Sequence, residues 1–296
     1  MTLTGLFVPL ITPFDADGGV ARAALERLAS EMVGAGVSGL VALGTTAETG
    51  SLTAPERAAV LDVVATVCRA RSVPLVVGAG TGPELAALAG RPEVVAALTV
   101  VPPFVRPGEA GVIAQFRTLA AASPVPLIVY DVPLRTGQYL SAAALRELAA
   151  IPGVAGVKHC GLTADTVELL AGPPRDFAIL AGEDVLAGPL LALGAHGAIL
   201  ASAHCATDAF VSLVRAWEAG DVATARALGA GLSRVSSALF AAPNPAVIKA
   251  VLHAQGRIPT PDVRLPLLAA PPELAERAIA AEAAVRDAVV EAAAAA

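Results

Sequence analysis

Lysine is almost absent from this chain of 296 residues. Lysine and arginine together number 20, and only Lys158 and Lys249 are lysines. Because arginine supplies the positive charge everywhere else, each lysine raises the question of what a permanently protonated guanidinium could not do. The net charge of −6 is mild and leaves no basic surface for nucleic acid, so we expect no such partner.

Cysteine is also scarce, and its three residues are odd in number and widely spaced. This pattern argues against a disulfide framework and favours a reducing compartment, so we expect a cytoplasmic protein. The N-terminal segment MTLTGLFVPLITPFD has no basic region and is expected to form a first strand, not a signal peptide. The uncharged run 185–207 is long enough to span a membrane. Its proline, glycines and histidines favour a buried helix, a turn and a buried strand, with no membrane partner.

Apolar residues make up 55% of the chain, which is enough to fill the core of one large α/β domain. They occur in short runs that are continuous in apolar or small residues instead of alternating with polar ones. Such runs are typical of parallel strands that are buried on both faces. The predicted strands are Leu6–Ile11, Gly39–Leu43, Pro74–Gly78, Val94–Val100, Pro126–Tyr130, Val154–Lys158, Phe177–Ala181 and Gly197–Ala201.

Amphipathic segments between these runs predict helices. Arg22–Ala35 carries its apolar residues on one face. Thr53 and Glu56 have the spacing of a capping box that opens a helix to about Arg69. The segment after the third strand, GPELAALAGRPE, is short for a helix that connects two parallel strands. Further helices are expected to begin near Gly108, Ser141, Thr163, Asp184 and Thr207.

Eight strands, each followed by a helix, predict a (β/α)₈ TIM barrel. The alternative is an open doubly wound sheet, which usually carries a glycine-rich phosphate loop after its first strand. The segment TPFDADGG at that point is not such a loop. The strand pattern stops after Trp217, and three helical segments follow. We therefore expect residues 1–220 to form the barrel with the active site and residues 221–296 to form a helical extension packed on it.

Active sites of such barrels lie at the carboxyl ends of the strands. Four predicted strands end in polar residues: GTTAE after the second, YDVPLRTG after the fifth, KHCG after the sixth and GED after the seventh. This arrangement places five candidate side chains at one mouth of the barrel: Thr45, Thr46, Tyr130, Arg135 and Lys158.

Lys158 lies at the end of a buried strand, where loss of solvent lowers the pKa of an amine. A neutral amine can form a Schiff base with a carbonyl compound, and arginine cannot replace it. The alternative is that Lys158 turns outward and pairs with a carboxylate. Lys249 lies within the predicted helix NPAVIKAVLHAQG, and we interpret it as a surface or interface charge.

The other candidates also have two interpretations. Tyr130 can transfer protons at the substrate or be a core tyrosine with a satisfied hydroxyl. The backbone N–H groups at Thr45 and Thr46 can bind a carboxylate, although Gly-Thr pairs are common in turns. Arg135 can bind a carboxylate through two hydrogen bonds or lie on a solvated face.

Histidine and cysteine offer a rival chemistry. His159 and Cys160 follow the sixth strand, and His204 and Cys205 follow the eighth, so four zinc ligands could meet at the barrel mouth. Neighbouring residues on an extended backbone point to opposite sides, however, and no pair has the spacing of a zinc finger or a helical site. We therefore interpret these residues as packed or partly exposed side chains and expect no metal and no cofactor.

The longer motifs resemble the dihydrodipicolinate synthase / N-acetylneuraminate lyase family of class I aldolases. The most specific of them are GTTAET, YDVPLRTG, GVKHCG and AGEDVLAGPLLALGAHGAI, in the order of that family, and the similarity extends from GLFVPLITPFDADGGV to NPAVIKAVLHAQG. The resemblance implies a metal-independent lyase that forms a Schiff base with pyruvate or another 2-oxo acid. It also implies a homodimer or a homotetramer built from dimers.

The resemblance assigns roles to individual residues. Lys158 matches the lysine that forms the Schiff base, and Tyr130 matches the tyrosine that transfers protons to the adduct. Thr45 and Thr46 match the pair that binds the pyruvate carboxylate, and Thr46 also relays protons from Tyr130. Two further positions, Gly182 and Ile199, match backbone positions that line the pocket.

Arg135 matches the arginine that receives the carboxylate of the aldehyde in the synthases, and it favours condensation of pyruvate with aspartate semialdehyde in lysine biosynthesis. Another 2-oxo-acid aldolase or dehydratase is the alternative, acting on 4-hydroxy-2-oxoglutarate or a keto-deoxy sugar acid. A non-catalytic 2-oxo-acid binding protein and a zinc-dependent aldolase are the remaining alternatives.

The chain also departs from the synthases. Phe104 stands where a tyrosine of the neighbouring subunit completes the proton relay, so the ring is kept and the hydroxyl is lost. Ala54, Arg57 and Pro103 replace groups that bind lysine as a feedback inhibitor, which predicts that the lysine site is not built.

Overall fold

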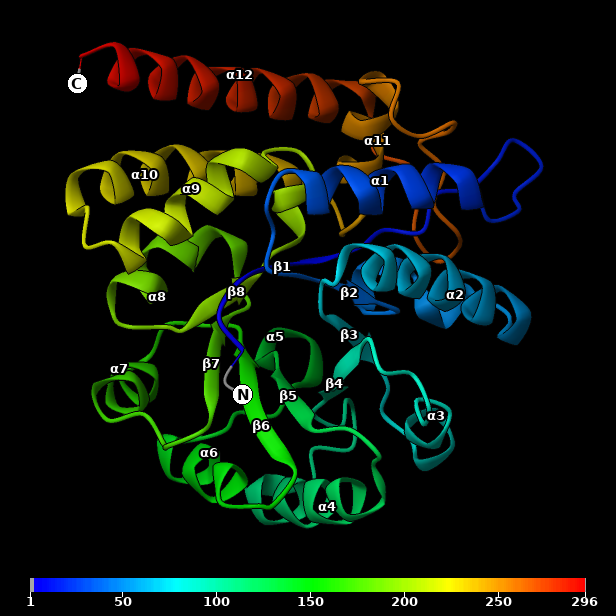
Figure 1. Ribbon diagram of the computed structural model, residues 1–296, viewed down its shortest axis with the longest axis vertical. Coiled ribbons are helices and arrows are strands. Elements are labelled where there is room, and N and C mark those ends of the chain that lie inside the picture. The colour runs from blue at the N-terminus through cyan, green and yellow to red at the C-terminus, as the bar shows by residue number, and fades with distance from the viewer. Residues whose placement is uncertain (1–2, 296) are drawn as a thin grey trace.

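The computed structural model describes residues 3–295, and it describes side chains as far as residue 286. Its centre is a closed barrel of eight parallel strands, each paired with its neighbours in chain order, with β8 closing on β1 (Figure 1). The predicted TIM barrel is confirmed, and the strand ends differ from the prediction by at most two residues. The strands are β1 (Gly5–Pro9), β2 (Gly39–Ala42), β3 (Leu75–Gly78), β4 (Val94–Val100), β5 (Leu127–Asp131), β6 (Val154–His159), β7 (Ala178–Ala181) and β8 (Gly197–Ile199).

Helices connect the strands and surround the barrel. The capping box at the start of α2 is present, since the Thr53 side chain accepts from the backbone N–H of Glu56 and the Glu56 side chain accepts from that of Thr53. The predicted truncation of the third helix is confirmed, because α3 has only five residues. The helices are α1 (Arg22–Gly34), α2 (Ala54–Arg71), α3 (Gly82–Ala86), α4 (Gly108–Ala122), α5 (Pro133–Thr136), α6 (Ala142–Ala149), α7 (Ala164–Ala171), α8 (Ala187–Ala192) and α9 (Thr207–Glu218).

Four short 3₁₀ turns lie at the carboxyl ends of strands, on the side of the barrel that carries the site. They are η1 (Thr45–Ala47), η2 (Thr49–Ser51), η3 (Asp184–Leu186) and η4 (Ala201–His204). The uncharged run 185–207 therefore contains a helix, a turn and a strand, as expected. Within residues 3–295 we find no helix that combines the length and apolarity needed to cross a bilayer.

Two groups of apolar side chains fill the core. One group, which includes Phe7, Val76 and Ile128, lies inside the barrel. The other, which includes Val8, Leu40 and Val129, lies between the strands and the surrounding helices. Successive residues of a strand point to opposite faces, so both groups draw on the same strands. This explains why the strands read as unbroken apolar runs.

Three helices follow α9 at one end of the molecule: α10 (Val222–Leu239), α11 (Ala246–Ala254) and α12 (Pro272–Ala295). α10 packs on α8, α9 and η3, α11 contacts η4, and α12 packs on α10 and α11. In Figure 1 α12 forms the outermost layer at this end. The helical C-terminal segment is thus present, while its division from the barrel between residues 220 and 221 stays a prediction.

Candidate active site

A cavity of about 260 Å³ opens at the carboxyl ends of the strands. Six of the eight predicted site residues line it: Thr45, Thr46, Tyr130, Arg135, Lys158 and Gly182. Ile199 is instead buried inside the barrel, in the same apolar cluster as Tyr130. Phe104 is 90% exposed and is not among the residues that line the cavity of this single chain.

Lys158 points into this cavity and is 7% exposed. It lies on β6 in direct register with Tyr130 on β5, so the parallel pairing of the two strands brings the side chains together. The Lys158 Nζ lies 4.4 Å from the centroid of the Tyr130 ring. The alternative in which Lys158 turns out of the barrel toward a carboxylate does not agree with this geometry.

The pKa of Lys158 is shifted in the direction opposite to the expected one. Burial is the largest single influence and acts to lower the pKa of Lys158, as expected. The acidic groups of Tyr130, Cys160 and Asp184 together outweigh burial, however, and the pKa of Lys158 is raised above its ordinary value. The amine therefore rests as an ammonium, and it must release a proton before it can attack a carbonyl carbon.

Gly182 has a specific reason to be glycine. It follows β7, and its N–H donates to the carbonyl oxygen of His159 at 2.8 Å. A Cβ atom at this position would lie 2.7 Å from Cys160 Sγ and 2.7 Å from Lys158 Cγ. The stem of the lysine therefore passes directly over Gly182, and any side chain here would displace it.

Thr45 and Thr46 form the start of η1, directly after β2. Thr46 is buried and Thr45 is exposed, so the two hydroxyls face different surroundings. Asn244 Nδ2 donates a hydrogen bond to Thr46 Oγ1 at 2.9 Å. Because its oxygen is already an acceptor, the Thr46 hydroxyl has its own proton free to donate into the cavity. The assigned roles of both threonines stay predictions.

Asp184 and Asn244 also line the cavity, and no role was predicted for either of them. Asp184, in the GED motif after β7, is buried and accepts from the Ser202 N–H at 2.6 Å. Burial raises the pKa of Asp184 to about 6. The position of GED at a strand end was a signal that could have identified it. Asn244 could not have been found in this way, since it lies 198 residues from Thr46.

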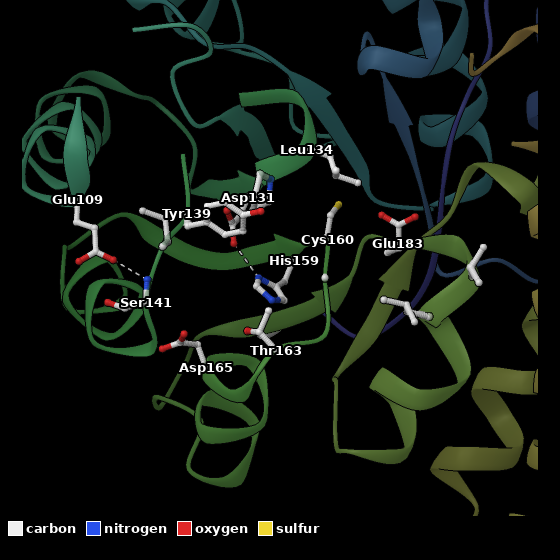
Figure 2. A pocket seen from close by; sticks show the side chains of 15 residues that line it. Glu109, Asp131, Leu134, Tyr139, Ser141, His159, Cys160, Thr163, Asp165 and Glu183 are labelled. Carbon is white, nitrogen blue, oxygen red and sulfur yellow. Dashed lines mark hydrogen bonds and ion pairs between the residues drawn. The ribbon is translucent and has the colours of Figure 1, made fainter. Parts of the chain in front are cut away.

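A second, larger cavity of about 640 Å³ lies beside the first, and Figure 2 shows its lining residues. Leu134, Cys160 and Glu183 line both cavities. His159 at its inner wall is hydrogen-bonded through both ring nitrogens, to Asp131 Oδ2 and to Thr166 Oγ1, each at 2.8 Å. Asp131 and His159 directly follow Tyr130 and Lys158, so they face the opposite side of the barrel wall.

The second His-Cys pair lies elsewhere and is also packed. His204 Nε2 accepts from the Ile11 N–H at 3.2 Å, and its Nδ1 lies 2.8 Å from the Ala201 carbonyl oxygen. Burial lowers the pKa of His204 to about 4, which keeps the ring neutral. Within the described residues, no three His, Cys, Asp or Glu side chains are grouped closely enough to hold a metal ion.

The interpretation of Lys249 as a surface or interface charge was wrong. Its side chain is fully buried, and Nζ lies 2.6 Å from Glu48 Oε1 in an ion pair inside the protein. Glu48 directly follows η1, so this pair lies behind the Thr45–Ala47 turn.

Comparison with known proteins agrees with this geometry. The model of the dihydrodipicolinate synthetase family matches residues 2–282. The chain belongs to this family. It is 36% identical to the 4-hydroxy-tetrahydrodipicolinate synthase of Neisseria meningitidis serogroup B, covering 90% of this chain and 93% of that protein. It is also 36% identical to the protein of that name from Moorella thermoacetica, covering 93% and 96%.

Solved structures of the dihydrodipicolinate synthetase family share the fold. The dihydrodipicolinate synthase of Acinetobacter baumannii, complexed with pyruvate, has a TM-score of 0.89 and 31% identity over 96% of this chain and 100% of that one. The synthase of Bacillus anthracis has a TM-score of 0.87 and 28% identity over 96% and 99%. The resemblance seen in the sequence motifs is confirmed.

Proposed function

We propose that this protein is a 4-hydroxy-tetrahydrodipicolinate synthase, which condenses pyruvate with aspartate semialdehyde through a Schiff base on Lys158. The observation that carries the proposal is the buried Lys158, with its Nζ over the Tyr130 ring, in a cavity that also holds Thr45, Thr46 and Arg135. Membership of the family and relatives of that name support the choice of reaction.

The chemistry begins with proton release from Lys158 and attack of its amine on C2 of pyruvate. The carbonyl oxygen leaves as water and a C=N bond remains. Loss of a proton from C3 then gives an enamine, whose C3 forms a bond to the aldehyde carbon of the second substrate. Tyr130 faces the amine and is placed to give and take the protons of these steps.

The carboxylates of the two substrates fit two different parts of the cavity. The N–H groups of the turn at Thr45 and Thr46, with the free proton of the Thr46 hydroxyl, suit the carboxylate of pyruvate. Arg135 lies exposed at the mouth of the cavity and suits the carboxylate of an incoming aldehyde, which a guanidinium can bind through two hydrogen bonds. This separation leaves the reacting carbons between the two sites.

We also propose that a second copy of the chain covers one side of the cavity. Phe104, Val105 and Leu134 are 90%, 76% and 90% exposed, which is unusual for large apolar side chains near a site. Their two loops are adjacent, since the Gly108 N–H donates to Gln138 Oε1 at 3.0 Å. A homodimer, or a homotetramer of dimers, would bury them. The three scattered cysteines further support a cytoplasmic location.

The test combines trapping with an assay. Borohydride reduction in the presence of pyruvate should add one pyruvate-derived mass to the peptide that contains Lys158, and a coupled assay should show turnover with aspartate semialdehyde. Lys158→Arg should abolish both results while the protein stays folded, because a guanidinium is not a nucleophile at neutral pH. An adduct at Lys249, or none, would refute the mechanism. An adduct at Lys158 without turnover of aspartate semialdehyde would favour another 2-oxo-acid aldolase.

A further inference from the structure

Lys249 is held by three groups in the interior. Its Nζ donates to Glu48 Oε1 at 2.6 Å and to the Asp262 carbonyl oxygen at 2.7 Å, and it lies 3.9 Å from the centroid of the Phe14 ring. Burial lowers the pKa of Lys249 to about 8 although Glu48 opposes the shift, so the amine is mostly protonated at neutral pH. Lys249 and Glu48 therefore form a charged pair in the core.

Glu48 occupies a strained position at the end of η1. Its φ of 56° and ψ of 35° lie in the left-handed region, which residues with a side chain rarely adopt and which persists where the surrounding structure holds the residue in place. Its N–H donates to the Thr45 carbonyl oxygen at 3.1 Å. The conformation of Glu48 thus determines where the turn of Thr45 and Thr46 ends.

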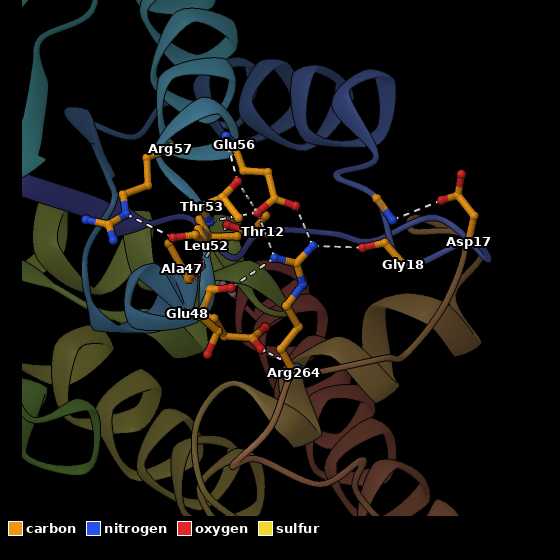
Figure 3. Close-up of polar contacts among 12 residues, drawn as sticks. Thr12, Asp17, Gly18, Ala47, Glu48, Leu52, Thr53, Glu56, Arg57 and Arg264 are labelled. Atoms are coloured by element: carbon orange, nitrogen blue, oxygen red, sulfur yellow. Dashed lines mark hydrogen bonds and ion pairs between the residues drawn. The ribbon is translucent and has the colours of Figure 1, made fainter.

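Both carboxylate oxygens of Glu48 are bound by the C-terminal part of the chain. Oε1 accepts from Lys249 on α11, and Oε2 accepts from the Arg264 N–H at 2.7 Å. The Arg264 side chain continues to the Ser51 carbonyl oxygen at 3.0 Å and to Glu56 Oε2 at 2.9 Å (Figure 3). The segment from η1 to the start of α2 is therefore connected at several points to one stretch of the C-terminal region.

A buried ion pair is a poor way to gain stability, because the desolvation of two charges offsets most of their attraction. Apolar side chains of similar size would pack in the same place at no such cost. The ion pair does fix an orientation. Each hydrogen bond restricts where the Glu48 carboxylate lies, and this restricts the orientation of the η1 backbone. Glu48 lies two residues after Thr46, so this restraint acts on the turn that carries Thr45 and Thr46.

We infer that Glu48, held by Lys249 and Arg264, is a positioning residue that orients the Thr45–Thr46 turn toward the carboxylate of the 2-oxo acid. The inference rests on the proposed function, since it specifies how the pyruvate half of the cavity is kept in shape. It makes α11 and the segment around Arg264 necessary for pyruvate binding, although neither Lys249 nor Arg264 lines the cavity.

The experiment measures how pyruvate concentration governs borohydride trapping at Lys158 without aldehyde, alongside steady-state KM values for both substrates. Lys249→Met removes the ammonium but keeps an unbranched side chain. It should raise the half-saturating pyruvate concentration on the order of 10-fold, because small misplacements of a binding group are costly. The aldehyde KM should stay within about twofold, since Arg135 is untouched.

Two further variants separate positioning from stability. Glu48→Gln/Lys249→Met removes both buried charges, so it should fold even if the single variant does not, and it should keep the raised pyruvate requirement. Arg257→Met is the matched control. Arg257 also joins the C-terminal region to the barrel, through the His204 carbonyl oxygen at 2.7 Å and Glu31 at 3.0 Å. It does not contact η1, so its pyruvate requirement should match that of the unaltered protein.

A folded Glu48→Gln/Lys249→Met protein with an unaltered pyruvate requirement would overturn the inference. An equal rise in the Arg257→Met protein would also overturn it, since the effect would then follow from any loosening of the C-terminal region. If the unaltered protein forms no adduct with pyruvate at all, the proposed function fails first. The two failures can therefore be told apart.

Discussion

Lys158 and Lys249 have the same side-chain amine but lie in different environments. Lys249 is enclosed, with its charge matched by Glu48 at 2.6 Å, and nothing can approach it without opening the protein. Lys158 lies at a cavity, beside the Tyr130, Cys160 and Asp184 side chains that raise its pKa. The Lys249 ammonium is thus part of the packed interior, whereas the Lys158 amine can react with a substrate once it loses a proton.

Asp184 offers a test of how the Lys158 ammonium is controlled. Its negative charge helps to raise the pKa of Lys158, so Asp184→Asn should lower that pKa and leave more neutral amine at a given pH. The pH profile of adduct formation with pyruvate should therefore move to lower pH. Trapping at a series of pH values measures the shift, and a profile that moves to higher pH would show that Asp184 does not act through its charge.

Arg135 should affect one substrate and not the other. Arg135→Ala should raise the KM for aspartate semialdehyde about 10- to 100-fold, because it removes a carboxylate contact that is made through two hydrogen bonds. The KM for pyruvate should change little. Steady-state kinetics with each substrate varied in turn measures both values. If both KM values stay unchanged, Arg135 is not the aldehyde site, and the assignment to aspartate semialdehyde loses its support.

The position of Lys158 was predictable from the sequence, but the direction of its pKa shift was not. A lysine at the end of a buried strand is visible in the sequence, and so is the Tyr130 strand beside it. The direction of the Lys158 pKa shift is not visible in the sequence, because the acidic groups that oppose the effect of burial come from β5, the loop after β6 and the loop after β7. The interpretation of Lys249 was wrong for the same reason, since its partner Glu48 lies 201 residues away from it in the sequence. Pairings between distant segments leave no local pattern.

At the scale of elements, α11 and η1 form one unit although they are far apart in the sequence. Asn244, just before α11, contacts Thr46, and Lys249 within α11 contacts Glu48. Both elements were predictable individually. The strands were predictable because burial on both faces leaves unbroken apolar runs, and α2 because its capping box is local in sequence. Their contacts were not, since the paired residues lie 198 and 201 positions apart and no local pattern joins them.

The start of α2 and the short α3 allow a prediction about regulation. Arg57 Nη1 lies 3.7 Å from Glu84 Oε1, and Glu84 Oε2 accepts from the N–H groups of Gly80 and Thr81 at 3.0 and 3.1 Å. The Glu84 carboxylate is thus already occupied, and Arg57 would repel an ammonium. Millimolar lysine should leave the rate unchanged in the coupled assay. Strong inhibition by lysine would show a site of different construction.

At the scale of the whole molecule, neutral His204 joins the two ends of the barrel sequence. It connects η4, after β8, to Ile11, after β1. The unfolded chain binds a proton at this histidine near pH 6.5, whereas burial lowers its pKa in the folded protein to about 4. Stability should therefore be intact above pH 6.5 and should fall as the pH drops toward 4, by roughly 3 kcal/mol from this group.

Urea unfolding at several pH values tests this loss. His204→Gln is the matched variant, since an amide can still accept from the Ile11 N–H and donate to the Ala201 carbonyl oxygen. Asp184 acts in the opposite direction, because its pKa is raised to about 6, and it does so equally in both proteins. The unaltered protein should lose more stability than the variant between pH 6.5 and 4. Equal losses would mean that His204 is not the group that titrates.

The burial of both lysines changes what an amine-acylating reagent would report. Lys158 is 7% exposed and Lys249 is 0% exposed, while the positive side-chain charges on the outside are carried by arginines, which such reagents leave intact. At a fixed pH, acylation of Lys158 would report entry of the reagent into the cavity together with the fraction of neutral amine, and pyruvate should protect the residue. Acylation of Lys249 would require α11 to separate from η1, so its much slower rate would time the local opening of the protein. The acylated masses of two peptides would thus report both events in one sample.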